Sequence, residues 1–511
     1  MSTANRVIKN TGYLYAKMGI TMFISLYTTR LILNSLGATD FGIFNIVGGA
    51  IAMLGFLNAA MAGATQRFMS YTEGEGNKEK QKSIFNVSVV LHFLIALLVG
   101  VVLLIAGYFF FNGILNIPSD RMFAAQVVYG SLILSTMFTV MTVPYDAVLN
   151  AHENMLYYSI VGIVESVLKL SVAFIVVYTL SDKLIVYGIL MACIPLITMS
   201  IMRVYCHKHY EECIIRPHKY WHKGLMKEMS SFAGWNLLGS ISSILGSYGL
   251  GIVLNHFWGA LLNAAQGIGN QLCGQLQVLS NTMLKAVNPV IAKSEGAGNR
   301  NLMLEVSLEG CKISYLLMAF ISIPALIEMP YIMKLWLGKV PEWATLFCQL
   351  QIIRTLIEQL TILLGTAIAA QGDIVTYSKI KSLLNILPLI LTYIFFYYGF
   401  LPYWMYIGWI FSWGIVGGII SLYIAKKKCG LSLNKYSKTV LFPCLIITIV
   451  CLIPNIYIKH LFESDLLSFM AVCSFSSLTF ILVGWYKILS TKEKVFILNS
   501  IKTLKNKYRK S

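Results

Sequence analysis

Long apolar runs divide the sequence at fairly regular intervals, and each is about twenty residues long, the length of a helix that crosses a bilayer. Such helices are expected at residues 11–34, 41–64, 84–108, 123–144, 155–179, 184–205, 230–254, 260–286, 306–329, 343–370, 376–398, 402–425, 439–457 and 466–487. Inside a bilayer, a helix satisfies its backbone hydrogen bonds within itself. The sequence therefore predicts an all-α integral membrane protein with about 14 transmembrane helices.

The composition agrees with a membrane bundle, because 57% of the residues are hydrophobic and only 12% are charged. Soluble domains usually carry about 25% charged residues. The sequence has no low-complexity repeats, which argues against disordered and fibrous classes. The ten cysteines are scattered mostly through apolar runs without CxxC spacing, so we expect neither a disulfide framework nor a metal site.

The formal net charge of +18 is distributed asymmetrically between the predicted loops. If the N-terminus is cytoplasmic, 30 of the 40 lysines and arginines lie on the cytoplasmic side, five lie outside and five lie within spans. The positive-inside rule then places both termini in the cytoplasm. This placement accounts for the charge without a nucleic-acid partner. The lysines at 426–428 and the basic tail from Lys487 are predicted to be orientation anchors beside anionic membrane lipids.

An internal repeat appears when the sequence is shifted on itself by 222 residues, which aligns residues 36–79 with 258–301. Residues 73–78 (EGEGNK) then meet residues 295–300 (EGAGNR). Both copies follow the second helix of their half, so the repeat is parallel and typical of transporters. We expect an N-terminal six-helix lobe at 1–205, a cytoplasmic linker at 206–229, and a C-terminal six-helix lobe at 230–425. An extra helix pair with a basic cytoplasmic tail is expected at 426–511.

Residues 30–44 (RLILNSLGATDFGIF) and 66–71 (QRFMSY), followed by GEGNK at 74–78, resemble polysaccharide flippases of the MOP (multidrug/oligosaccharidyl-lipid/polysaccharide) superfamily. The general pattern covers nearly the whole chain. The resemblance implies export of undecaprenyl-pyrophosphate-linked oligosaccharides across the bacterial cytoplasmic membrane by rocking lobes, coupled to an ion gradient. It also implies a polysaccharide polymerase and glycosyltransferases as partners.

Other function classes fit less well. The second candidate is a small-molecule exporter of the multidrug and toxin extrusion (MATE) branch, which typically stops at twelve helices. A major-facilitator transporter usually has an Asp-Arg-x-Gly-Arg loop, which neither repeat copy carries. The polar stripes described next argue against a membrane scaffold without transport activity. The sequence has no phosphate-binding loop or catalytic triad, so we expect no enzyme, no catalytic residue and no cofactor. Four histidines lie in the basic linker region without regular ligand spacing: His207, His209, His218 and His222.

Polar stripes run along two of the predicted helices. At 100° per residue, one face of helix 260–286 carries Asn263, Gln266, Asn270, Gln277 and Asn281. One face of helix 230–254 carries Asn236, Ser240, Ser243 and Ser247. Such stripes either line a wet cavity that binds sugar hydroxyls or join helices through hydrogen bonds. We predict that Asn236, Gln266, Asn270 and Gln277 bind substrate.

Charged residues within the spans are candidates for function because they are costly in lipid. Lys17 is predicted to bind the pyrophosphate, although it could instead snorkel toward cytoplasmic headgroups. Arg30 points away from Lys17 and is expected to pair with Asp40 or with outer headgroups.

Two further pairs stand at i,i+4 spacing, Glu165 with Lys169 and Arg354 with Glu358. Each pair either neutralises itself or serves transport. In the second case Lys169 and Arg354 bind the diphosphate, and Glu165 and Glu358 couple transport to an ion. We predict that the faces of Lys17 and Arg354 line one cavity between the lobes, opposite the two amide stripes.

Overall fold

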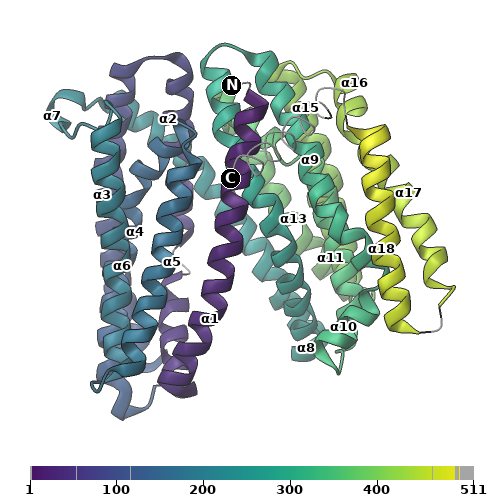
Figure 1. Cartoon of the computed structure of the whole chain (residues 1–511), viewed down its shortest axis with the longest axis horizontal. Coiled ribbons are helices and arrows are strands. Elements are labelled where there is room, and N and C mark those ends of the chain that lie inside the picture. The colour runs from purple at the N-terminus through teal and green to yellow at the C-terminus, as the bar shows by residue number, and fades with distance from the viewer. Residues whose placement is uncertain (1–2, 53–54, 115–116, 463, 490–493, 495–511) are drawn as a thin grey trace, which may run out of the picture. The chain divides into compact units, whose positions relative to one another are not determined.

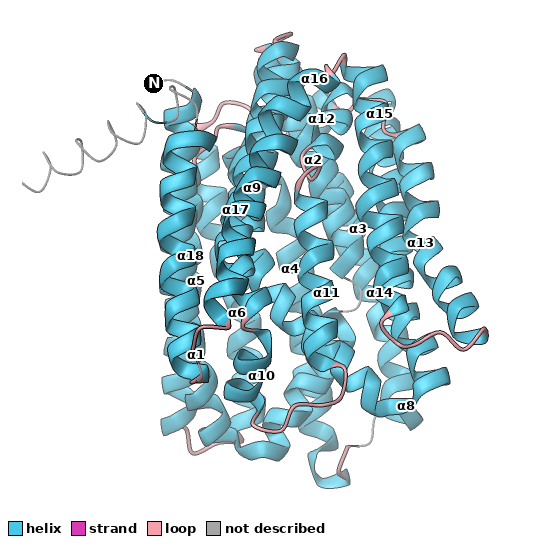
Figure 2. Ribbon diagram, turned by 90° about the vertical axis from the view of Figure 1, so that its right-hand side faces the viewer, coloured by secondary structure: helices cyan, strands magenta, loops and turns pink. Residues whose placement is uncertain are grey.

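The computed structural model describes residues 3–52, 55–114, 117–462, 464–489 and 494. Figure 2 shows helices and loops but no strand in this part of the chain, as the all-α prediction requires. Each of the fourteen predicted spans falls on one helix or on adjoining helical segments. Most of the expected basic tail lies outside the described residues.

The first part of the chain forms mostly long helices. They are α1 (Thr3–Ala52), α2 (Gly55–Glu75), α3 (Lys78–Phe109), η1 (Phe110–Ile114), η2 (Ser119–Arg121), α4 (Met122–Ala151), α5 (Met155–Tyr178), α6 (Lys183–His209) and the short α7 (Pro217–Tyr220). Figure 1 shows α3, α4 and α6 running side by side, and α4 packs against α2, α3 and α6. The core there includes Val128 and Tyr129 of α4 and Leu103 of α3.

The second part begins with the longest helix. Its elements are α8 (Lys223–Gly296), α9 (Arg300–Ile327), α10 (Met329–Leu337), α11 (Ala344–Gln359), α12 (Leu364–Gln371), α13 (Val375–Tyr397), α14 (Trp404–Trp409), η3 (Ile410–Val416), α15 (Gly417–Cys429), α16 (Leu433–Tyr436), η4 (Ser437–Leu441), α17 (Phe442–Lys459), α18 (Asp465–Val483) and η5 (Gly484–Ile488). Helix α17 packs on α9 and α18, and α12 packs on α15.

Ten helical segments of the described chain are long and apolar enough to cross a membrane, or eleven if the bent pair α11 and α12 forms one span. The protein is therefore a multi-pass membrane protein. The spans expected at 11–34, 41–64 and 260–286 are helical at their described residues but fall outside this count. Polar and charged residues interrupt the apolar character of these segments, among them Lys17, Arg30 and the amide stripe.

Contacts divide the chain into two compact units. The N-terminal unit consists of Val7–Ile241 and Ala292–Asn299. The C-terminal unit consists of the described residues of Met1–Arg6, Ser242–Ile291 and Arg300–Ser511. Helix α8 therefore contributes to both units. The predicted lobe and linker boundaries at 205, 229 and 425 stay a prediction.

The backbone supports the 222-residue repeat. Gly37 breaks α1 at φ 79°, and Gly259 breaks α8 at the same φ. Gly76 and Gly298, at φ 69° and 73°, form the second pair of glycines separated by 222 residues. Only glycine adopts positive φ without steric cost, so all four positions need glycine for the same reason. Both halves of the chain therefore make the same two turns.

The predicted outer end of the N-terminal unit is closed by an arginine clamp. The guanidinium of Arg121 donates to Asp40 at 2.8 Å and to Asp182 at 2.7 Å. Asp182 also caps α6 by accepting from the backbone N–H groups of Leu184 and Ile185. Of the two alternatives for Arg30, pairing with Asp40 is wrong, because Arg121 pairs with Asp40 and the Arg30 side chain is exposed, whereas contact with outer headgroups stays a prediction.

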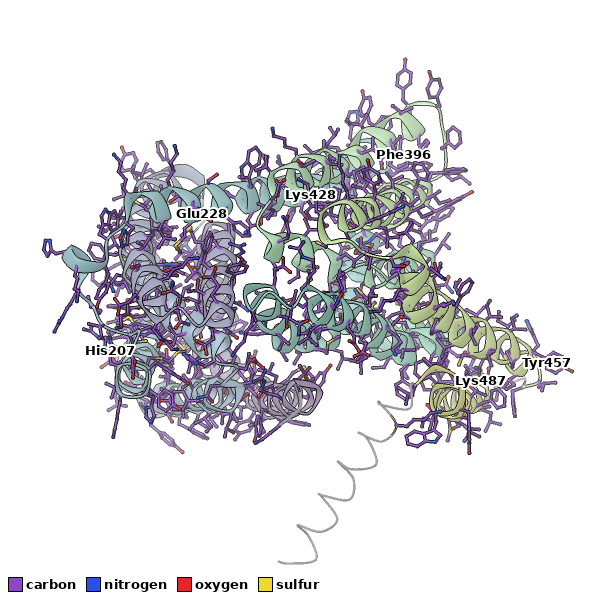
Figure 3. The ribbon with its side chains drawn as sticks, turned by 90° about the horizontal axis from the view of Figure 1, so that it is seen from above. His207, Glu228, Phe396, Lys428, Tyr457 and Lys487 are labelled. Atoms are coloured by element: carbon purple, nitrogen blue, oxygen red, sulfur yellow. The ribbon has the colours of Figure 1, made fainter. Side chains whose placement is uncertain are left out.

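One of the expected basic anchors is part of the fold. Figure 3 labels Lys428 of α15, whose ammonium group pairs with Asp373 in the turn between α12 and α13. This ion pair joins the end of α15 to that turn within the C-terminal unit. Lys428 therefore has a structural partner besides any lipid headgroup.

Candidate functional site

Lys17 of α1 packs on α5 within the N-terminal unit. Its Nζ lies 4.3 Å from the centre of the Tyr158 ring, a cation–π distance. One turn further along α5, Gly162 leaves the room that the side chain needs. A Cβ atom on Gly162 would lie 2.1 Å from Cε and 2.4 Å from Nζ of Lys17. A neighbouring helix therefore holds the ammonium group.

Glu165 and Lys169 continue the same face of α5. Tyr158, Gly162, Glu165 and Lys169 follow the spacing of four, three and four residues that places side chains on one side of a helix. Lys169 Nζ lies 2.7 Å from Glu165 Oε1. We call Lys17, Tyr158, Gly162, Glu165 and Lys169 the α5 column. With both lysines charged and the glutamate ionised, the column carries a net charge of about +1.

The exposure of the Glu165–Lys169 pair is the informative property of this column. Both side chains are 42% exposed although they lie on a predicted span. A half-exposed ion pair is costly against lipid unless water or a polar ligand reaches it. The pair forms between the two predicted partners, and both side chains stay partly exposed on the surface of the N-terminal unit.

Arg354 of α11 has a different environment, inside the C-terminal unit. The residue is only 5% exposed, and its guanidinium pairs with Glu358. The guanidinium group lies beside two indole rings, with Cζ 4.3 Å from the Trp409 centroid and 5.7 Å from that of Trp413. Nε also donates to Gln351 at 3.3 Å. Arg354 is thus buried and fully engaged, and it would have to move before it could contact a ligand.

The amide stripe of α8 faces α11. Gln277 donates to Thr355 at 3.3 Å, and Asn270 accepts from Gln351 at 3.2 Å. Gln266 is buried, whereas Asn270 is exposed. In this structure Asn270 and Gln277 therefore form hydrogen bonds between helices, which is one of the two alternatives for this stripe. The side chain of Asn263 lies outside the described part.

Asn236 belongs to the part of α8 in the N-terminal unit and lies next to α2. Its Nδ2 is 3.8 Å from the position that a Cβ atom on Gly63 would take.

The structure thus assigns the predicted residues to two groups. Lys17, Glu165, Lys169 and Asn236 lie in the N-terminal unit, and Gln266, Asn270, Gln277, Arg354 and Glu358 lie in the C-terminal unit. A single cavity lined by Lys17 and Arg354 stays a prediction.

Four neighbours of these residues were not predicted. Tyr158 and Gly162 could have been found by extending the Glu165–Lys169 spacing toward the start of the helix. Trp409 and Trp413 stand at i,i+4 in the span 402–425, but aromatic residues are common in membrane helices. Nothing in the sequence connects them to Arg354.

Metal and thiol chemistry have little support in the described chain. No group of three histidine, cysteine, aspartate or glutamate side chains there could hold a metal ion. All ten cysteines are free, and most are buried.

Solved membrane transporters share this fold. A MOP superfamily transporter from Pyrococcus furiosus matches with a TM-score of 0.68 at 14% identity, over 86% of this chain and 100% of its own. A MATE structure in the bent conformation gives a TM-score of 0.70 at 15% identity, over 85% and 96%. The Vibrio cholerae MATE transporter VcmN in its bent form gives 0.64 at 16% identity, over 85% and 99%. At these identities the likeness shows the fold alone.

Sequence comparison identifies the family. No curated protein matches the chain significantly. A family model described as polysaccharide biosynthesis protein matches residues 7–295, which is more than half of the chain. The chain therefore belongs to the polysaccharide biosynthesis protein family and has the fold of MOP superfamily membrane transporters.

Proposed function

We propose that the protein is a flippase that exports undecaprenyl-pyrophosphate-linked oligosaccharides across the bacterial cytoplasmic membrane. It works by alternating access, is driven by an ion gradient and has no enzymatic activity. Both termini lie in the cytoplasm. Its partners are the lipid-linked oligosaccharide, membrane lipids, and the polymerase and glycosyltransferases that act on the same sugar chain. Membership of the polysaccharide biosynthesis family supports the substrate class.

The observation that carries the proposal is the half-exposed charge of the α5 column. A pyrophosphate cannot cross a low-dielectric layer without cations beside it. Lys17 and Lys169 supply two ammonium groups on neighbouring helices of one unit. Lysine suits a phosphate ligand because its ammonium group is a compact charge with three donors. The sugar would be bound by amides such as Asn236, while the lipid tail stays in the bilayer.

Glu165 is the proposed coupling residue, because it is half-exposed and holds Lys169. Binding of an ion or proton by Glu165 would release Lys169 to the pyrophosphate. Glu358 is a weaker candidate, because its partner Arg354 is buried and stacked. We propose Arg354, Gln266, Asn270 and Gln277 as contacts of a later state, after rearrangement of the α8–α11 interface.

The test is an export assay in proteoliposomes with a lipid-linked oligosaccharide whose sugar carries a quenchable dye. An external quencher reports how much sugar has crossed. We expect Lys17→Ala and Lys169→Ala each to slow export about 10- to 100-fold, the effect of losing one hydrogen bond to a charged group. Lys339→Ala is the matched control, because this exposed lysine lies in a loop outside the spans. Export by the Lys17→Ala, Lys169→Ala double variant at the control rate would refute the proposal.

Small-molecule export is the second candidate, favoured by the MATE transporters among the structural matches. The same proteoliposomes distinguish the two functions. A flippase should move the labelled lipid-linked sugar and leave cationic dyes in place. Gradient-driven dye transport without sugar transport would establish the second function instead.

A further inference from the structure

The ends of α2 and α8 cross at two glycines within the N-terminal unit. A Cβ atom on Gly74 would lie 2.0 Å from the backbone oxygen of Lys293 and 2.9 Å from the backbone nitrogen of Ala297. A Cβ atom on Gly296 would lie 1.8 Å from the backbone oxygen of Tyr71. Real Cβ contacts are not this short. Neither position can carry a side chain unless the two backbones separate.

The crossing follows the internal repeat. Gly74 and Gly296 are separated by 222 residues, and so are Tyr71 and Lys293. Gly74 approaches Lys293, and Gly296 approaches Tyr71, which is the repeat partner of Lys293. The two contacts are therefore equivalent, as in a two-fold symmetric interface.

Gly74 and Gly296 are among the last residues of α2 and α8, where glycine is common because a positive φ ends the helix. Their φ values are ordinary, unlike those of Gly76 and Gly298. Close approach of the backbones is what requires glycine at 74 and 296.

Ion pairs surround the crossing. Lys293 Nζ lies 3.6 Å from Glu73 Oε1 and 3.7 Å from Glu153 Oε1. His152 Nδ1 lies 3.4 Å from Glu73, and its Nε2 contacts Glu212. The side chains of Glu153 and Glu212 are 1% exposed, so these contacts are shielded from screening by salt.

Other elements of the unit brace the same charges. Gln81 of α3 donates to Glu73 at 2.6 Å, and Lys78 pairs with Glu73 at 3.1 Å. The His152 ring stacks on Tyr210 with 4.2 Å between centroids. Arg67 of α2 lies within electrostatic reach of two acidic residues of α8, Glu295 beside the crossing and Glu228, which Figure 3 labels.

The C-terminal half of the chain enters this unit only briefly. Residues 292–299 belong to the N-terminal unit, whereas residues 242–291 and those from 300 onward belong to the other. This eight-residue insert is held by the glycine crossing and by Lys293. The chain on both sides of the insert belongs to the C-terminal unit. When the contacts of the glycine crossing and of Lys293 break, movement of that unit can therefore pull the insert away from the N-terminal unit.

We propose that the crossing of Gly74 and Gly296, with Lys293 and its partners, is a latch that opens and closes during transport. The inference rests on the proposed function, because alternating access requires contacts at one end of the molecule to form and break. The closed latch is the state of this structure. Release withdraws residues 292–299 from the acidic side chains that hold Lys293.

The first experiment measures the latch without any substrate. Gly74→Ala and Gly296→Ala, each in the full-length chain, should expose a cysteine that replaces Ser294, a residue of the insert that is only 6% exposed. We expect its maleimide labelling to rise about tenfold or more, the effect of overpacking a close contact, and by similar amounts in the two variants. Gly224→Ala is the control, because this helical glycine of α8 has open space around its Cβ position. Unchanged labelling in both test variants would refute the latch.

The second experiment keeps the glycines and locks the contact. A short, reducible bis-methanethiosulfonate cross-link between Glu73→Cys and Lys293→Cys should stop export, and reducing it should restore the export rate of the uncross-linked double variant. Full export by completely cross-linked protein would overturn the latch. The labelling and cross-linking results test the latch, whereas the exported substrate tests the flippase function. If both latch results are as expected but the protein exports dyes and no lipid-linked sugar, the latch is supported and the flippase function is rejected.

Discussion

The side chain of Lys17 occupies the space that a Cβ atom on Gly162 would need, 2.1 Å from Cε. The glycine thus determines where the ammonium group sits on α5, above Tyr158.

Gly162→Ala should therefore weaken export without removing any charge. The added methyl group pushes Lys17 away from Tyr158, and we expect a loss of about tenfold, smaller than that of Lys17→Ala. The quencher assay measures it. Gly130→Ala in α4, a glycine with open space at its Cβ position, is the control. Equal export by Gly162→Ala and Gly130→Ala would show that the position of Lys17 does not matter.

Arg354→Ala should lower the stability of the protein as well as its activity. The change leaves the Glu358 carboxylate without its partner next to a buried surface, which typically costs about 3–5 kcal/mol. Arg354→Lys keeps the charge but loses the guanidinium group that lies 4.3 Å from the centre of the Trp409 ring. The thermal unfolding temperature in detergent should be highest for the wild type, lower for Arg354→Lys and lowest for Arg354→Ala. The Arg354→Ala, Glu358→Gln double variant should recover part of the loss, and no recovery would contradict the pairing.

The Arg121 clamp should make the N-terminal unit sensitive to acid. Burial alone would raise the pKa of Asp182, but hydrogen bonds from Arg121 and from the start of α6 hold it below its usual 3.8. A carboxylate with a lowered pKa stabilises the fold above its ordinary pKa, and that contribution disappears as the pH falls through the lowered value.

Arg121→Ala should accordingly reduce the unfolding temperature at neutral pH, and its difference from the wild type should shrink as the pH falls below 3.8. Each of the two partly exposed ion pairs of Arg121 contributes up to about 1 kcal/mol to the free energy of unfolding, so the unfolding temperature should fall by a few degrees. Unfolding scans between pH 7 and pH 3 measure it. A difference that does not change with pH would mean that Arg121 acts through packing alone.

The topology prediction depends on the 30-to-5 distribution of basic residues. Reporter fusions or cysteine labelling should place Lys78, Lys219 and Arg300 in the cytoplasm, together with the C-terminal tail. An external signal at one of these positions, in a protein that still exports substrate, would contradict the orientation.

Much of the fold is predictable because membrane helices are encoded locally. An apolar run specifies a helix wherever it lies, so the predicted spans fall on helical segments. The repeat also aligns Gly37 with Gly259 and Gly76 with Gly298, but the sequence alone did not predict that all four glycines adopt positive φ.

The site was predictable only in part. The i,i+4 spacing identified both ion pairs, but spacing does not reveal which pair is buried. Arg354 is buried and lies over the ring of Trp409, a residue distant in the sequence, whereas Lys169 stays half-exposed. The partner of Asp40 was missed for the same reason, because Arg121 is brought to it by tertiary packing.

The matching glycines of the two halves have a consequence for tracing descent. Most side chains of a membrane helix can be exchanged for another apolar residue at little cost, so residue identity is lost quickly. A one-residue turn at positive φ, as at Gly37 and Gly259, can change only if two helices are rebuilt together. The spacing of such glycines should therefore outlast overall identity as a marker of common ancestry, both between the halves of this chain and between it and distant transporters.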